Sequence, residues 1–552
     1  MKASHPLGRR ASRTLLAAVA ATTLLAVGTA CAPSESPVAT GGTLTIAQEI
    51  PPVLDPAFME SDRVRTILMN LYEPLLHVSA DGSIEPGLAE SWESSEDGTV
   101  WTFTIRSDAK FSDGSPLTAE DVRYSLVRAL TPISAEEQQA LGVQTSSPKG
   151  LAVLPDVVGV ADIQSGAADA LPEDAITATD ERTLVITLTG PSSDILARLA
   201  YPALGAVQQA NVEGAEGDQP WWYAPVSSGP FEMTEFEPES LTTLVPNEDF
   251  YGTTSGLDAV EFRVIADSQT GIVAWEADEM DIVKVLTSEV ENLRSSGYEE
   301  QVVSSQDAQT VVLLANPIGP TSDMHVLRAL AMAIDKETLA SALDDLVTPA
   351  YTFTSPIIPG YDMDGVPLLE FDVDAAKAEL DESDFAGQPI TINVNMPGSL
   401  DSRALPIIAQ MWEQNLGITV NILNELPPAT APQEQAANLL LLTQGPNYTG
   451  ICAMARRWPD FLTFAGGANN VNFGAIDAPG LAGVVEDCTT APDEAAAWES
   501  VREFETLLTE NPQFIPMWYG NSYYLVNDAV QNLRFGNNWQ IANLPEVGVA
   551  AE

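Results

Sequence analysis

The sequence predicts an α/β protein with two or three lobes, and three observations support this class. The chain has 552 residues, more than one ordinary hydrophobic core holds. Short stretches of alternating apolar residues, typical of strands, are interleaved with longer stretches whose apolar residues recur at helical spacing. No internal repeat occurs at the periods of solenoid proteins. Such a chain buries enough apolar surface to be stable without disulfide or metal staples.

The N-terminal segment predicts export. Basic residues as far as Arg13 precede an apolar run from Leu15 to Val27, and small residues lead to Cys31. The apolar run is short for a membrane span, so residues 1–30 are typical of a signal peptide for the general secretory route. Cys31 after small residues resembles a bacterial lipobox, although Gly28 stands where an apolar residue is usual. We therefore expect a lipid on Cys31 that anchors the chain to the outer face of the cytoplasmic membrane; the alternative is a soluble secreted protein.

The segment after the signal predicts a tether and then the first strand. Residues 31–42 contain too few large apolar side chains to pack, and we expect them to be flexible. Alternation predicts a strand from Thr43 to Gln48. Pro51 and Pro52 prevent a helix in the segment that follows, Glu49 to Pro56. That segment suits a loop lining a ligand cleft, and it equally suits a surface turn.

The stretch from Leu71 to Leu130 predicts a compact unit of strands, turns and one helix. Apolar residues alternate over Val100–Ile105, which predicts a strand. Thr118 is placed to cap a helix whose apolar residues recur four apart. Three aspartate-glycine pairs separate these elements and are typical of tight turns, because glycine tolerates positive φ; they lie at 81–82, 97–98 and 113–114.

Strands and helices continue to alternate up to the C-terminus. Further strands are expected within residues 181–190, 225–252, 257–267, 391–396 and 418–423, and helices over 192–200, 325–334, 402–417 and 495–509. Asp335 is placed to cap a second helix that ends near Leu343. A turn at Pro516 precedes a last long strand, which we expect to return to the first lobe.

Three sequence blocks carry a resemblance to a known family: YEPLL at 72–76, SIEPGLAESWE at 83–93 and TIRSDAKFSDGSPLTAEDVRYSL at 104–126. They resemble the extracytoplasmic solute-binding proteins of family 5, the peptide, nickel and opine receptors of ABC importers. The resemblance implies a two-lobed clamp like the type II periplasmic binding proteins (cluster C), with an extra domain inserted in lobe one. It implies lobe I from residues 43–64, 197–308 and 526–552, an inserted domain II from 65–196, and lobe II from 309–525.

The resemblance also implies how the protein works. Ligand would contact both lobes only in the closed form, so binding would shift the population toward closure at a hinge near 309–316 and 524–528. The implied partners are a small-molecule or peptide ligand, most often an oligopeptide in this family, and an ABC permease in the membrane. We expect a monomer that binds the membrane through Cys31 and needs no cofactor.

Charge and motif content exclude several other functions. The chain carries 24 Lys and Arg against 78 Asp and Glu, a net charge of −54, so nucleic acid is not an expected partner. This acidity suits a well-solvated surface, or alternatively a preference for cationic ligands. The three histidines lie far apart, at 5, 77 and 325, and no metal, nucleophile or phosphate-loop motif occurs, so we expect no catalytic residue and no metal site. The alternatives are a secreted hydrolase using an acid pair and a surface signalling or adhesion module.

The segment ARRWPDF, residues 455–461, is the main candidate for ligand contact. Arg456 or Arg457 could bind a carboxylate with a planar fork, or could balance surface acids instead. In peptide-binding members of the family a tryptophan-aspartate segment with the spacing W-x-x-D anchors the ligand's amino group; Trp458 and Asp460 have the shorter spacing W-x-D. Other candidate ligand residues are two in the loop after the first strand and two aromatic residues that could stack on ligand or pack in a core: Glu49, Ile50, Trp222 and Trp518.

Two cysteines remain after the lipidation candidate. Cys452 and Cys488 form an even pair in a chain expected in an oxidising compartment. We expect a disulfide between them; the alternative is two buried thiols.

Overall fold

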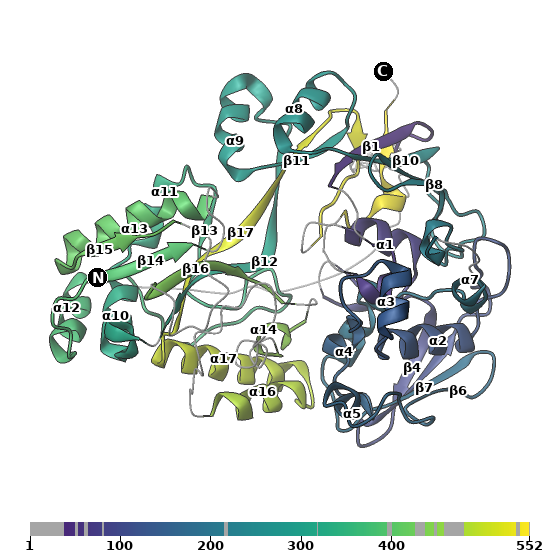
Figure 1. Ribbon diagram of the computed structural model, residues 1–552, viewed down its shortest axis with the longest axis horizontal. Coiled ribbons are helices and arrows are strands. Elements are labelled where there is room, and N and C mark those ends of the chain that lie inside the picture. The colour runs from purple at the N-terminus through teal and green to yellow at the C-terminus, as the bar shows by residue number, and fades with distance from the viewer. Residues whose placement is uncertain are drawn as a thin grey trace, which may run out of the picture. The chain divides into compact units, whose positions relative to one another are not determined.

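A mixed β-sheet organises the protein (Figure 1). The computed structural model describes residues 38–49, 53–59, 64–79, 82–214, 219–316, 318–394, 400–424, 437–446, 450–456, 480–536 and 541–550. These belong to one unit spanning Val38–Glu552. The neighbouring strands of the sheet are, in order, β15 (Val420–Ile422), β14 (Ile390–Val394), β16 (Leu439–Gln444), β12 (Val302–Ala315), β17 (Phe514–Val526), β11 (Ile282–Val285), β1 (Thr43–Gln48), β10 (Ala259–Val264), β9 (Leu241–Pro246) and β8 (Phe231–Glu237).

Two long strands, β12 and β17, lie side by side in the middle of this order. They pair antiparallel from Val302 opposite Leu525 to Leu314 opposite Phe514. The register shifts between Gln306 and Thr310, and again where Pro516 lies opposite Val312. A turn at Pro516 was predicted, and this prediction is wrong: Pro516 lies inside β17, where a strand irregularity accommodates a residue that has no N–H to donate.

On one side of β12 the sheet is covered on both faces. Alternate residues of β12 and β16 point to opposite faces, so Leu313 and Leu441 enter one apolar cluster while Leu314 and Leu442 enter another. Helices α10 (Met324–Met332), α11 (Lys336–Ala342) and α13 (Leu400–Leu416) supply the first cluster, in which Trp412 is fully buried. Helices α16 (Leu481–Thr489) and α17 (Glu494–Glu510) supply the second. This burial of both faces explains the continuous apolar sequence of β16.

The predicted helix caps are present in this part. Asp335 accepts a hydrogen bond from the Thr338 N–H at the start of α11. α13 ends at Leu416, and the next residue, Gly417, has a φ of 68°, the left-handed conformation that stops a helix. β14 precedes α13 in the chain and β15 follows it, and the two strands pair in parallel, as expected for a strand, helix and strand in this order.

A smaller antiparallel sheet contains the stretch that resembles family 5. Its order is β4 (Ala89–Ser94), β5 (Val100–Ile105), β7 (Thr183–Thr187) and β6 (Ile176–Ala178). α2 (Ala119–Ala129) begins after Thr118, whose N–H and hydroxyl both donate to Asp121. The three predicted turn glycines, Gly82, Gly98 and Gly114, all have positive φ. The local sequence therefore accounts for this unit.

The remaining elements connect or flank the two sheets. The helices are α1 (Arg65–Leu71), α3 (Ala135–Leu141), α4 (Gly150–Val153), α5 (Val160–Gln164), α6 (Ile195–Leu199), α7 (Gln209–Glu213), α8 (Ser268–Glu276), α9 (Thr287–Leu293), α12 (Val373–Glu382) and α14 (Ala453–Arg456). The strands are β2 (Leu76–Val78), β3 (Ile84–Pro86), β13 (Thr348–Pro349), β18 (Val530–Gln531) and β19 (Gly548–Val549). No helix in the described part of the chain is long and apolar enough to cross a bilayer.

The expected tether is shorter than predicted. Residues 1–37, which include the predicted signal peptide and Cys31, lie outside the described residues. Ala39 N–H donates to Gln531 Oε1 at 2.9 Å, and Gly41 N–H donates to Gly256 O at 2.6 Å. Gly42 N–H donates to an Asp258 carboxylate oxygen at 2.9 Å. The prediction that the tether reaches residue 42 is corrected, because these backbone groups are hydrogen-bonded to the body of the protein.

Candidate functional site

The two long strands join separate hydrophobic cores. Tyr524 and Val526 of β17 pack into a core built mainly from residues between Leu44 and Phe262, whereas Ile515 and Trp518 pack into the core of α10, α11 and α13. β12 likewise contributes residues from Val311 onward to the second set of clusters. Strands that leave one core and enter another are where a two-lobed protein bends, so the candidate site is built around them.

A buried polar cluster lies at the register shift of β12. The Asp307 carboxylate accepts a hydrogen bond from the Ser522 hydroxyl at 3.0 Å, and both residues are almost fully buried. Burial and the nearby Asp307 charge raise the pKa of Tyr524, so its hydroxyl stays protonated as a donor. The Tyr524 ring stacks on Phe535 with 4.0 Å between ring centroids. Because Asp307, Ser522 and Tyr524 are all almost fully buried, this cluster belongs to the protein interior and presents almost no surface to a ligand.

Asp55 anchors the described part of the loop that follows β1, residues 53–59. This fully buried carboxylate accepts hydrogen bonds from Arg128 Nη1 at 2.7 Å and from Trp221 Nε1 at 3.1 Å. It also caps the short turn that follows by accepting from the Ala57 N–H. Glu49, near the start of the loop, is exposed, and Ile50 lies outside the described residues. The described part of the loop, residues 53–59, is therefore held in place by Asp55.

The two predicted aromatic contacts lie in cores. Trp222 is 4% exposed and packs edge-to-face on Phe236 with 5.7 Å between centroids. Trp518 is 2% exposed and belongs to the core of α10, α11 and α13. In this structure both aromatics are core residues and leave almost no surface for a ligand to stack on, so the expectation of ligand contact is corrected for both.

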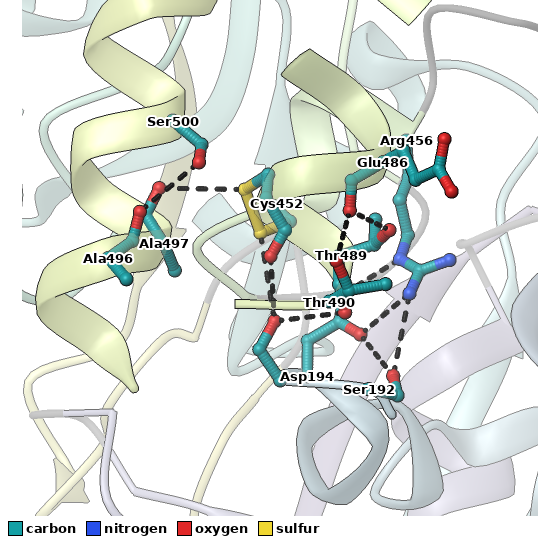
Figure 2. The surroundings of a disulfide bond; sticks show 12 residues. Ser192, Asp194, Cys452, Arg456, Glu486, Thr489, Thr490, Ala496, Ala497 and Ser500 are labelled. Atoms are coloured by element: carbon teal, nitrogen blue, oxygen red, sulfur yellow. Dashed lines mark hydrogen bonds and ion pairs between the residues drawn. A yellow bond between two sulfur atoms is a disulfide. The ribbon is translucent and has the colours of Figure 1, made fainter. Parts of the chain in front are cut away.

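Arg456 binds carboxylates of the protein itself (Figure 2). Its guanidinium donates to both oxygens of Asp194, at 2.9 and 3.1 Å, and to both oxygens of Asp156, at 3.1 and 3.2 Å. The predicted planar fork is thus present, but protein acids rather than a ligand carboxylate occupy it. Of the two predicted partners for Arg456, a ligand carboxylate and acids of the protein, the structure shows the second.

Arg198 completes this charged group. Its side chain is fully buried, and it contacts Asp194 at 3.0 Å and Asp156 at 2.5 Å. Burial acts to raise the pKa of Asp156, but the charges of Arg198 and Arg456 outweigh it and hold the pKa below its usual value. Two arginines and two aspartates therefore form a balanced, ionised quartet.

Cys452 and Cys488 form a disulfide beside the quartet, with 5.9 Å between their Cα atoms. The bond joins the residue before α14 to α16, and Figure 2 shows it next to Arg456 and Thr489. The Ser193 hydroxyl donates to the Cys488 carbonyl at 2.9 Å, and the Ser193 N–H donates to the Thr489 carbonyl at 3.0 Å. The disulfide therefore holds the surface that the loop around Ser193 contacts.

The other candidate residues fall into two groups. Arg457, Trp458 and Asp460 lie outside the described residues. His77 is hydrogen-bonded to Glu73 at 2.7 Å, as suits a structural histidine. No group of three or more potential metal ligands occurs within the ranges described.

Several residues that build the site were not singled out from the sequence. Asp156 and Asp194 are two acids among 78 Asp and Glu, and no local pattern distinguishes them. Asp307 had no distinctive signal either, because it lies among the polar residues of its strand, between Gln306 and Gln309. Its neighbour Ser522, 215 residues away, is fixed only by the strand pairing.

Comparison with known proteins gives a family match over more than half of the chain. The model of the bacterial extracellular solute-binding proteins, family 5 (Middle), matches residues 83–450. The periplasmic oligopeptide-binding protein OppA of Escherichia coli is 25% identical over 482 residues, which cover 84% of each chain. The nickel-binding periplasmic protein of Escherichia coli is 28% identical over 379 residues, covering 64% of this chain and 66% of that relative.

Solved structures share the fold. The periplasmic murein tripeptide binding protein MppA, in an unliganded open form, aligns with a TM-score of 0.76 at 23% identity. The alignment covers 94% of this chain and 99% of that one. The chain thus has the two-lobed α/β clamp fold with a mixed sheet that its sequence predicted.

Proposed function

Because this chain belongs to the bacterial extracellular solute-binding proteins of family 5, we propose that its solute is an oligopeptide, which it delivers to an ABC permease. The observation that carries the proposal is the match to OppA over 84% of both chains, since that relative binds oligopeptides.

The proposed division into lobes follows the hydrophobic cores. Lobe I comprises residues 43–64, 197–308 and 526–552, with residues 65–196 inserted as domain II, and lobe II comprises 309–525. The change of core before Val311 in β12 supports the boundary near 309, and the change in β17 lies between Trp518 and Tyr523, a few residues before the proposed boundary at 525. The register shift between Gln306 and Thr310 lies beside the proposed hinge at 309–316. A strand irregularity leaves backbone free of ladder bonds, so it concentrates bending there.

Closure follows from differential contact. A peptide between the lobes contacts both of them only when they are closed, so its binding energy shifts the population toward the closed form. Arg457, Trp458 and Asp460 remain the proposed ligand residues of lobe II, and Glu49 and Ile50 those of lobe I. The permease binds the surface that the closed form presents, and no covalent bond is made or broken in this cycle.

The proposed cellular arrangement completes the function. Residues 1–30 direct export, and a lipid on Cys31 holds the monomer at the outer face of the membrane. Lipidation shortens the search for the permease, because the receptor stays within a chain length of the bilayer.

Native mass spectrometry of the purified protein tests the solute class. We expect a co-purified mass that fragments as a peptide, and a decrease in the radius of gyration when a tripeptide library is added to stripped protein. Nickel with a histidine chelator serves as the matched alternative ligand. Binding of the chelate without any response to peptides would overturn the peptide assignment.

A further inference from the structure

The residues just before β1 are clamped against the end of the chain. Gln531, in β18, accepts a hydrogen bond from the Ala39 N–H at 2.9 Å. The Gly41 N–H donates to the Gly256 carbonyl at 2.6 Å. Gly548, in β19, leaves room for this arrangement, because a Cβ on it would lie 2.5 Å from the Ala39 carbonyl oxygen, closer than real Cβ contacts come. β18 and β19 pair with each other, so together they hold the N-terminal segment on lobe I.

The clamp limits the length of chain between the proposed lipid and the body of the protein. Residues 31–37, seven in number, link the lipid on Cys31 to Val38. An extended chain spans at most about 3.6 Å per residue, so this link reaches at most about 25 Å. A link that stayed free up to residue 42 would have twelve residues and would reach about 43 Å. The clamp therefore determines both the reach of the link and the side of the body from which it leaves.

Charge does not explain an approach of this surface to a membrane. Asp258 and Glu546 are exposed near the clamp, and the exposed Arg534 is paired with Glu546. Segments that adsorb to anionic lipid carry clusters of Lys and Arg, which these described residues do not form. The link to Cys31, and not lipid charge, must therefore bring the surface to the bilayer, so uncharged lipid serves as well as anionic lipid.

We propose that the end of lobe I around Gly256, β18 and β19 is the surface of the receptor that faces the lipid bilayer. The proposal rests on the lipid anchor proposed above. Averaged over the orientations that the link allows, this end stays within reach of the lipid, and parts of the body far from it lie farther away. α12 is such a part, because it packs into the core beside β14, and β14 lies five strands from β1, about 24 Å at about 4.8 Å per strand.

Energy transfer to labelled lipid tests which surface faces the bilayer. The mature lipoprotein is reconstituted into phosphatidylcholine vesicles whose headgroups carry an acceptor dye, with a donor on Thr254→Cys beside the clamp or on Asp381→Cys in α12. Both positions are exposed, and the disulfide together with the lipid on Cys31 leaves the introduced cysteine as the only free thiol. We expect the donor at 254 to be quenched more than the donor at 381. Equal quenching at the two positions, or more at 381, would overturn the proposal.

Hydrogen exchange of the Gly41 N–H tests the clamp, and it does not depend on the lipid. Gly548→Ala forces Ala39 out of place, and Gln531→Ala removes the hydrogen bond that Ala39 donates. Each substitution should speed exchange at Gly41 about fivefold or more, as loss of one hydrogen bond does. Each should also reduce the quenching of the donor at 254, because the link becomes longer. Unchanged exchange and quenching in both variants would overturn the clamp.

Gly483→Ala in α16 is the matched control, because a Cβ at this position meets no atom within 4 Å. It should change neither exchange at Gly41 nor quenching. Failure of the proposed anchor looks different: neither donor would be quenched, which would overturn the membrane-facing surface together with the anchor, while both clamp variants would still speed exchange at Gly41. Failure of the peptide assignment is separate again, since peptides would not bind although the donor at 254 remained the more quenched.

Discussion

Removal of the Cys452–Cys488 disulfide should destabilise lobe II by a predictable amount. The bond closes a loop with a sequence separation of 36 residues. The chain-entropy relation for such a loop gives about 4 kcal/mol at 25 °C, because an open chain gains that much freedom on unfolding. For a lobe of this size the same free energy corresponds to a fall of about 10 °C in melting temperature.

Calorimetry of three samples tests this value. The oxidised wild type, the reduced wild type and the variant Cys452→Ala/Cys488→Ala are heated under the same conditions. We expect the reduced protein and the variant to melt at similar, lower temperatures, with the variant slightly lower because two fully buried sulfur atoms are lost. A melting temperature that is the same in all three would refute the reasoning, since it would mean that the loop is not released on unfolding.

Three further predictions concern single groups. The Glu73 charge raises the pKa of His77, although burial acts to lower it. The pairing therefore stabilises the fold fully below the pKa of His77 in the unfolded chain, and this stabilisation is lost as the pH rises through the pKa of His77 in the folded protein. Glu73→Gln should lower the His77 pKa in an NMR titration, and an unchanged pKa would contradict the pairing. Burial lowers the pKa of Lys336 to about 7, so above that pH the unfolded chain binds more protons than the folded protein, and the free energy of unfolding should rise from neutral pH toward pH 10. Lys336→Met should remove this rise in urea unfolding measured at several pH values. If the rise is retained in the variant, another group causes it. Asp55→Ala leaves Arg128 buried without its partner and should cost about 3–5 kcal/mol in urea unfolding, whereas Asp108→Ala, at an exposed ion pair, should cost less than about 1 kcal/mol.

Local chemistry explains why much of the fold was predictable. β1 and β5 have the predicted bounds, because their alternation and flanking turns are encoded within a few residues. Thr118 and Asp335 cap the predicted helices for the same reason. Pro516 was misread because a proline near a helix end usually marks a turn; only the pairing with β12, two hundred residues earlier, creates the irregularity that accepts it.

Arg456 shows where sequence reasoning stops and why. The sequence predicted that Arg456 binds a carboxylate of a ligand or of the protein, and protein carboxylates are what it binds. Which acids bind Arg456 could not be inferred, because the chain has 78 Asp and Glu and only tertiary packing brings Asp156 and Asp194 to it. Cys452, Arg456 and the proposed ligand residues Trp458 and Asp460 follow one another within one short stretch of the sequence. Because Asp156 and Asp194 hold the start of this stretch through Arg456, Arg456→Gln should change the release rate of solute even if the solute contacts only the residues that follow; an unchanged rate in stopped-flow measurements would contradict this reasoning.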